Sequence, residues 1–153
     1  MTDPKLDIVR IIESNWNAAN TNSITPRVST GWYDKKNVHP QISVTNPVET
    51  PNSEGPTGYF GAGTSGMPTQ LFDGTMSVIV WVPGNLRETL SVNPKAFLFN
   101  CREELRRICN VKFDQGTDID AIAWLGGSEM VDDEATPVIY RFNGEVGYNY
   151  YTG

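Results

Sequence analysis

Few residues of this chain have side chains suited to catalysis. His39 is the sole histidine, and the two cysteines, Cys101 and Cys109, lie eight residues apart. Most catalytic triads and imidazole metal sites need further histidine or cysteine partners, so His39 is interpreted as a structural or surface residue. On one helix the two cysteines would be about 12 Å apart, too far for a disulfide. We expect both to be small core residues.

The segment from Gly61 to Gly66 matches the GxGxxG pattern of dinucleotide sites. That motif needs a strand before it and a helix beginning within it, because the helix N-terminus binds the pyrophosphate. Gly58-Tyr59-Phe60 precedes the segment and Pro68 follows it, so neither condition is met. No phosphate site is predicted here.

Acidic residues gather late in the chain, at Asp118, Asp120 and the turn from Glu129 to Glu134. Their spacing lacks the twelve-residue pattern of a calcium loop with its central glycine and final glutamate. A solvated turn is therefore the expected structure. We predict no catalytic, cofactor or metal residue, and the chain is interpreted as a non-enzymatic protein.

Composition sets further bounds. The chain has 153 residues, a net charge of −6, 14 glycines and 10 prolines, and it is expected to form one domain over residues 1–153. The acidic balance argues against a protein that grips duplex DNA. No apolar stretch approaches the ~20 residues of a membrane span, and the start, MTDPKLDIVR, does not resemble a signal peptide. We expect a cytoplasm-like compartment.

The stretch from Asp73 to Asn110 organises the predicted fold. The β-branched run from Met76 to Val82 predicts a central strand that Pro83-Gly84 ends. Asn93-Pro94 then supplies an N-cap and a first-turn proline for an amphipathic helix. Its apolar residues are Phe97, Leu98, Cys101, Leu105, Ile108 and Cys109. Its charged face holds Arg102, Glu103, Arg106 and Arg107, which we expect to be solvated or to contact an adjacent ring or subunit.

Before this stretch, Asp3-Pro4 predicts a first helix over residues 4–19, and residues 40–45 predict a strand. Residues 24–33 are ambiguous, because Pro26 and Gly31 interrupt any alternation. Residues 47–74 show no periodicity and are interpreted as the long arm of a β-hairpin. Five apolar residues of the arm are expected to contact another subunit: Tyr59, Phe60, Met67, Leu71 and Phe72.

After the central helix, residues 118–125 predict a strand closed by Gly126-Gly127. Residues 137–151 keep their apolar parity across Asn143-Gly144, which favours one long strand, bulged there, over a two-residue hairpin. The fold class is thus α+β. We predict an antiparallel-type sheet of about four strands with two helices on one face and the long hairpin arm.

This order of elements resembles the tail-completion and tail-terminator family that joins head to tail in long-tailed phages and archaeal tailed viruses. The resemblance rests on the first helix, the Pro40-Ile42-Val44 strand, the arm, the VIVWV strand, the helix with EELRRI and the strand YRFNGEVGYNY. It covers most of the chain.

The resemblance implies a virion protein, assembled in the host cytoplasm, that forms a homo-oligomeric ring, usually a hexamer, at the head–tail junction. The ring would end the tail tube and contact the tail tube protein and the head connector or adaptor, while DNA passes without specific binding. The sequence is compatible with a tail terminator and with a head-side stopper or adaptor. The alternative is a small cellular binding module or enzyme that uses the glycine-rich loop 55–66 and the acidic turn 129–134.

Overall fold

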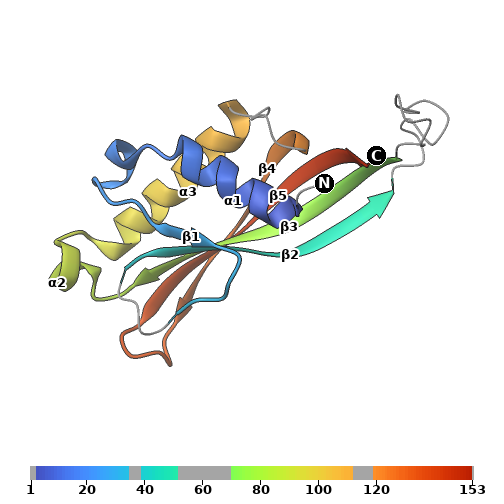
Figure 1. Cartoon of the computed structure of the whole chain (residues 1–153). Helices are drawn as coiled ribbons and strands as arrows, with labels where there is room; N and C mark the ends of the chain where they lie inside the picture. The colour runs from blue at the N-terminus through green and yellow to red at the C-terminus, as the bar shows by residue number, and fades with distance from the viewer. Residues whose placement is uncertain (1–2, 35–38, 52–69, 112–118, 153) are drawn as a thin grey trace.

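The computed structural model describes residues 3–34, 39–51, 70–111 and 119–152. Helices cover one face of a five-stranded sheet with the strand order β1-β2-β3-β5-β4 (Figure 1). The helices are α1 (Pro4–Asn15), the short 3-10 helix η1 (Ala18–Thr21), α2 (Leu86–Leu90) and α3 (Pro94–Val111). The strands are β1 (Arg27–Ser29), β2 (Gln41–Pro51), β3 (Gln70–Pro83), β4 (Ile119–Asp132) and β5 (Ile139–Thr152).

The predicted α+β class is confirmed, but the finer description is wrong in the number of strands, in the direction of one strand and in the number of helices. The sheet has five strands instead of about four, and it is mixed, because β1 pairs with β2 in parallel. The three residues of β1 follow Pro26, too few for a periodic pattern to reveal the strand. The third α-helix, α2, has only five residues and escapes detection for the same reason.

Both predicted helix starts are confirmed by their caps. The Asp3 side chain accepts from the backbone N–H of Lys5 at 2.9 Å. Asn93 accepts from the backbone N–H groups of Lys95 and Ala96 at 3.0 and 3.2 Å. These bonds satisfy amide groups that a helix N-terminus leaves free. The first helix stops at Asn15, earlier than predicted, and the chain leaves it in an extended conformation.

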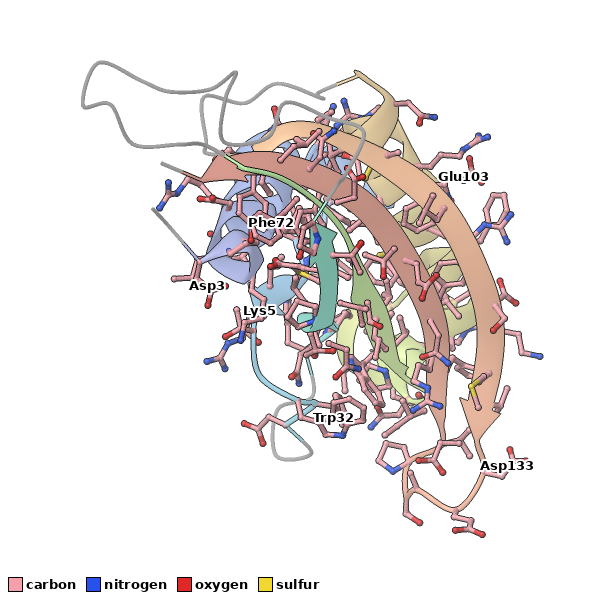
Figure 2. The ribbon with its side chains drawn as sticks, turned by 90° about the vertical axis from the view of Figure 1, so that its right-hand side faces the viewer. Asp3, Lys5, Trp32, Phe72, Glu103 and Asp133 are labelled. Carbon is pink, nitrogen blue, oxygen red and sulfur yellow. The ribbon has the colours of Figure 1, made fainter. Side chains whose placement is uncertain are left out.

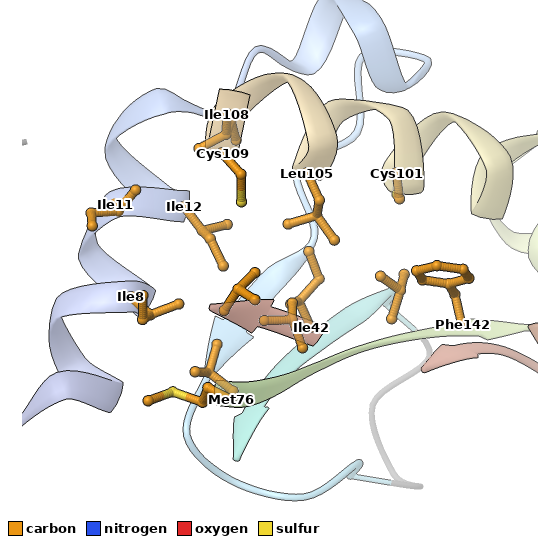
Figure 3. Packing of buried hydrophobic residues seen from close by; sticks show 14 of the residues in the cluster. Ile8, Ile11, Ile12, Ile42, Met76, Cys101, Leu105, Ile108, Cys109 and Phe142 are labelled. Atoms are coloured by element: carbon orange, nitrogen blue, oxygen red, sulfur yellow. The ribbon is translucent and has the colours of Figure 1, made fainter. Parts of the chain in front are cut away.

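The core lies between the helices and the sheet (Figure 3). Cys101 and Cys109 are free and buried in it, as predicted. Helical spacing on α1 and α3 and alternation on the strands bring the apolar residues onto one surface. Fully or almost fully buried members include Ile8, Ile11, Ile42, Val44, Met76, Val78, Val80, Phe97, Leu105, Ile108, Phe142 and Val146. Within the described part of the chain, none of the helices is long and apolar enough to cross a membrane.

The last strand is one continuous element, as predicted, but the irregularity lies on its neighbour. β5 keeps an unbroken register with β3 from Ile139 to Thr152. β4 continues through Gly126-Gly127 to Asp132, so the prediction that these glycines close the strand is wrong. Gly126 has a φ of +85°, and the β4–β5 register shifts between Trp124 and Gly126. Leu125 and Gly126 therefore form a β-bulge inside a long strand.

β2 and β3 form the predicted hairpin, and their pairing extends well into the predicted arm. The antiparallel register runs from Gln41 opposite Trp81 to Pro51 opposite Phe72, with a shift between Thr45 and Val48. The distal ends of these strands and of β5 continue past α1 (Figure 1). Residues 52–69 of the arm lie outside the described residues.

Candidate functional site

A cluster of hydrogen bonds braces the base of the hairpin arm across three strands. The Glu49 carboxylate on β2 accepts from the phenol of Tyr148 at 2.5 Å and from the phenol of Tyr150 at 2.6 Å. Both tyrosines lie on β5, and β3 runs between them and Glu49. Burial and the bonded carboxylate raise the pKa of Tyr148 and raise that of Tyr150 to about 12. We call these three residues the tyrosine–glutamate brace.

Two residues of β3, Gly74 and Phe72, pack against the tyrosines of the brace. A Cβ on Gly74 would lie 2.6 Å from the ring of Tyr148, so any larger residue there would displace that ring. Phe72 stacks on Tyr150 with ring centroids 5.5 Å apart. Two of the predicted contact residues of the arm are described: Phe72 is half-buried beside the brace, and Leu71 is buried. The other three, Tyr59, Phe60 and Met67, lie outside the described residues.

The outer face of α3 carries charge beside an exposed ring. Arg102 lies over the rings of Phe99 and Phe142, 5.4 and 5.7 Å from their centroids. Glu103 forms ion pairs with Arg102 and Arg106, at i,i+3 for the latter. The Arg106 side chain is 56% exposed and Phe99 is 48% exposed. Solvent screening leaves such exposed pairs little stabilising effect, so these side chains can exchange partners.

Arg107, predicted on the same charged face, is partly exposed and bonds to other parts of the same molecule. Its guanidinium donates to the buried Glu104 carboxylate at 2.6 and 2.9 Å and to the Asn15 carbonyl at 2.8 Å. Glu104 also accepts from the backbone N–H of Asn17 and from the Asn20 amide. This clasp, Glu104 with Arg107, fastens the end of α1 and the η1 turn to α3.

The electrostatics of the clasp favour the charged form of both partners. Burial alone would raise the pKa of Glu104, but the hydrogen bonds from Arg107, Asn17 and Asn20 hold it below its ordinary value. The same bond raises the pKa of Arg107. A buried carboxylate bonded this fully is a structural element.

The sheet face without helices carries an aromatic platform, made of Trp32, Tyr33 and Trp81. Trp32 meets Trp81 edge to face at 5.0 Å, and Tyr33 stacks on it at 5.1 Å. Arg141 lies over the Trp81 ring, 5.1 Å from its centroid. Trp81 also donates to Ser43 at 3.2 Å. Trp81 is buried, but Trp32 is 62% exposed, and Figure 2 shows it toward the same end of the molecule as Asp133.

A small cavity of about 200 Å³ adjoins the platform. It is lined by Tyr33, Glu134, Ala135, Thr136, Pro137 and Ile139. Glu134 lines the cavity, and together with the neighbouring Asp132 and Asp133 we call it the acidic rim. These residues belong to the predicted acidic turn, although Glu129 to Asp132 prove to be strand. Asp132, Asp133 and Glu134 are exposed, and no group of three His, Cys, Asp or Glu among the described residues is arranged to hold a metal ion.

The two cysteines and His39, the other residues considered for chemistry, are buried or bonded to the backbone. Burial raises the pKa of the Cys101 thiol and raises that of Cys109 to about 12, so both thiols are neutral near pH 7. His39 Nε2 donates to the Thr25 carbonyl at 2.8 Å. The glycine-rich loop 55–66, Asp118 and the side chain of Asp120 lie outside the described residues.

The sequence did not predict the brace, the clasp or the platform. Each depends on contacts between residues far apart in the chain, such as Glu49 with Tyr148, Asn17 with Glu104, and Trp32 with Trp81. A partial signal existed in the two tyrosines at alternate positions of one strand, which must share a face. Comparison of the sequence with protein-family models finds no matching family, and comparison with curated proteins finds no significant match.

Proposed function

We propose that this protein is a structural component of a tailed virion, which forms a ring at the head–tail junction, ends the tail tube and joins it to the head connector. The proposal continues the family resemblance of the sequence. In this role the chain contacts copies of itself, the tail tube protein and a connector or adaptor protein. DNA passes through the ring, and the net charge of −6 disfavours binding to its phosphates.

The observation that carries the proposal is the braced β2–β3 hairpin. Its strands pair as far as Pro51 and Phe72 and extend past the helices (Figure 1). The Glu49 bonds to Tyr148 and Tyr150 fix the base of the arm to the core. A projecting arm with a rigid base suits contact with a neighbouring subunit, because little freedom is lost when it docks.

Electron microscopy tests the proposal directly. The purified protein, studied by light scattering and negative-stain imaging, is expected to form closed rings, and labelled antibody is expected to mark the head–tail junction of virions. Absence of both rings and junction labelling would contradict the proposal. A thermal shift with nucleotides or divalent ions would instead favour a ligand-binding protein, because a ligand selective for the native state raises Tm.

A further inference from the structure

We propose that the aromatic platform and its acidic rim bind the outer face of α3 of a second copy, in a head-to-tail contact. The inference rests on the proposed function in one respect, since it takes self-assembly as given. It adds the two surfaces that meet and the chemistry that joins them.

The aromatic platform lies on the sheet face that carries no helix, and contacts within the molecule hold its residues in place. The helices pack on the opposite face, and the neighbouring positions on the open face are largely polar, such as Ser77 and Asn143. Two reciprocal hydrogen bonds of 3.0 Å between Asp34 and Gln41 fasten the loop that carries Trp32 to β2. An exposed tryptophan held in place resembles the anchor residues of protein interfaces, which are enriched in Trp, Tyr and Arg.

The rim selects a cationic partner. Its acids Asp132, Asp133 and Glu134 are exposed, and they outnumber Arg141, the cation that lies over Trp81. Glu134 and the ring of Tyr33 both line the cavity of about 200 Å³. That volume is below the ~300 Å³ at which small-molecule sites begin, so the cavity suits a single side chain. Arginine fits such a place best, because its guanidinium stacks on aromatic rings and pairs with carboxylates.

The outer face of α3 offers the complementary chemistry. Arg102 and Arg106 flank Glu103, so these three residues carry a net positive charge beside the exposed Phe99. Lys95 extends the positive charge toward the start of the helix, where it lies over Tyr140. Both surfaces thus combine an exposed ring with charge, and the charges are of opposite sign.

The placement of the two surfaces requires two copies. The platform lies on the open face of the sheet and α3 lies on the covered face, so one molecule cannot join them. Figure 2 shows Glu103 on α3 well away from Trp32 and Asp133. Contact between two unlike surfaces of identical chains is heterologous and builds a ring when the rotation closes. A platform-to-platform contact is disfavoured, because acidic rims would face each other.

Charge exchange tests the pairing, with sedimentation velocity and multi-angle light scattering on the full chain. Glu134→Arg and Arg106→Glu are each expected to weaken self-association about tenfold or more, and the double variant is expected to recover most of the loss. Trp32→Ala should weaken it about thirtyfold, as for an interface anchor. Glu13→Arg, an equal charge change at an exposed position of α1, is the matched control and should leave association unchanged.

The outcomes separate the inference from the proposed function. Circular dichroism and urea unfolding verify that each variant folds. An assembled wild type whose association none of these substitutions alters overturns the inference and leaves the ring intact. Single variants that dissociate without rescue in the double variant overturn the pairing of these two surfaces. A wild type that stays monomeric at every concentration overturns both the inference and the proposed ring.

Discussion

Tyr148 covers Gly74 on the neighbouring strand while its phenol donates to Glu49 one strand further away. One side chain thus ties together three strands, and glycine is the residue that lets it lie flat. The hairpin base depends on this arrangement, because β2 is held there both by its ladder with β3 and by the side-chain bonds to β5.

Gly74→Ala is expected to destabilise the protein by about 1–3 kcal/mol, because the new methyl group would overlap the Tyr148 ring in a packed sheet. Urea unfolding measures the change. Gly147→Ala is the matched control on β5, since a Cβ there meets its nearest atom, in Leu125, at an ordinary 3.5 Å. An equal loss in both variants would show that the Tyr148 contact is not the cause.

Removing the phenols of the brace should change how stability depends on alkaline pH. The pKa of Tyr150 is about 12 in the folded protein, above its ordinary value of 10.0, and that of Tyr148 is also raised. The stabilisation is therefore complete below about pH 10 and is lost as pH rises toward 12. The double variant Tyr148→Phe/Tyr150→Phe should be less stable at pH 8 and should lose less stability from pH 10 to 12. Parallel pH curves for variant and wild type would contradict this expectation.

Glu104→Gln is expected to cost about 1–3 kcal/mol, because it weakens a buried carboxylate bonded to Arg107, Asn17 and Asn20. Glu103→Gln, at the adjacent and partly exposed acid, should change stability by no more than about 0.5 kcal/mol. The folded pKa of Glu104 is lowered, so its contribution is present above the unfolded pKa and is lost as pH falls through the folded value. Urea midpoints measured from pH 7 to 3 should thus converge for wild type and Glu104→Gln.

The two thiols should be inert in the native protein. Cys101 and Cys109 are buried and their pKa values are raised, so an aromatic disulfide reagent at pH 8 should react with neither until denaturant is added. Absorbance of the released thiolate counts the reacted groups. Rapid labelling of one cysteine without denaturant would place that residue at an accessible surface.

Local signals predicted the parts of the fold that local physics determines. Asp3 and Asn93 cap helices wherever those helices pack, so both starts are found from sequence. The parity of β5 is equally local, and it excluded a turn at Asn143-Gly144. Gly126-Gly127 misled the prediction, because glycine pairs serve turns and bulges alike, and only the partner strand decides between them.

The candidate surfaces were less predictable, because register and packing decide them. Helical spacing placed Arg107 with Arg106 on a charged face, but it could not show that the Arg107 guanidinium bonds to Glu104 and to the Asn15 carbonyl at the end of α1. Trp32 gave no signal, since its neighbours in sequence are irregular and its contacts lie on β3. Side chains that meet across a sheet become visible only when the strand order is known.

The place of β5 has a consequence for how the chain reaches its native state. β5 follows β4 in sequence but lies between β3 and β4 in the sheet, and its pairs with β3 span from 56 residues (Pro83 with Ile139) to 82 residues (Gln70 with Thr152). Such long-range pairing slows folding, because loop closure precedes the contacts that reward it. Until β5 inserts, β3 and β4 each present an unpaired edge to other chains. The nascent protein is therefore most prone to aggregation before residues 139–152 join the sheet.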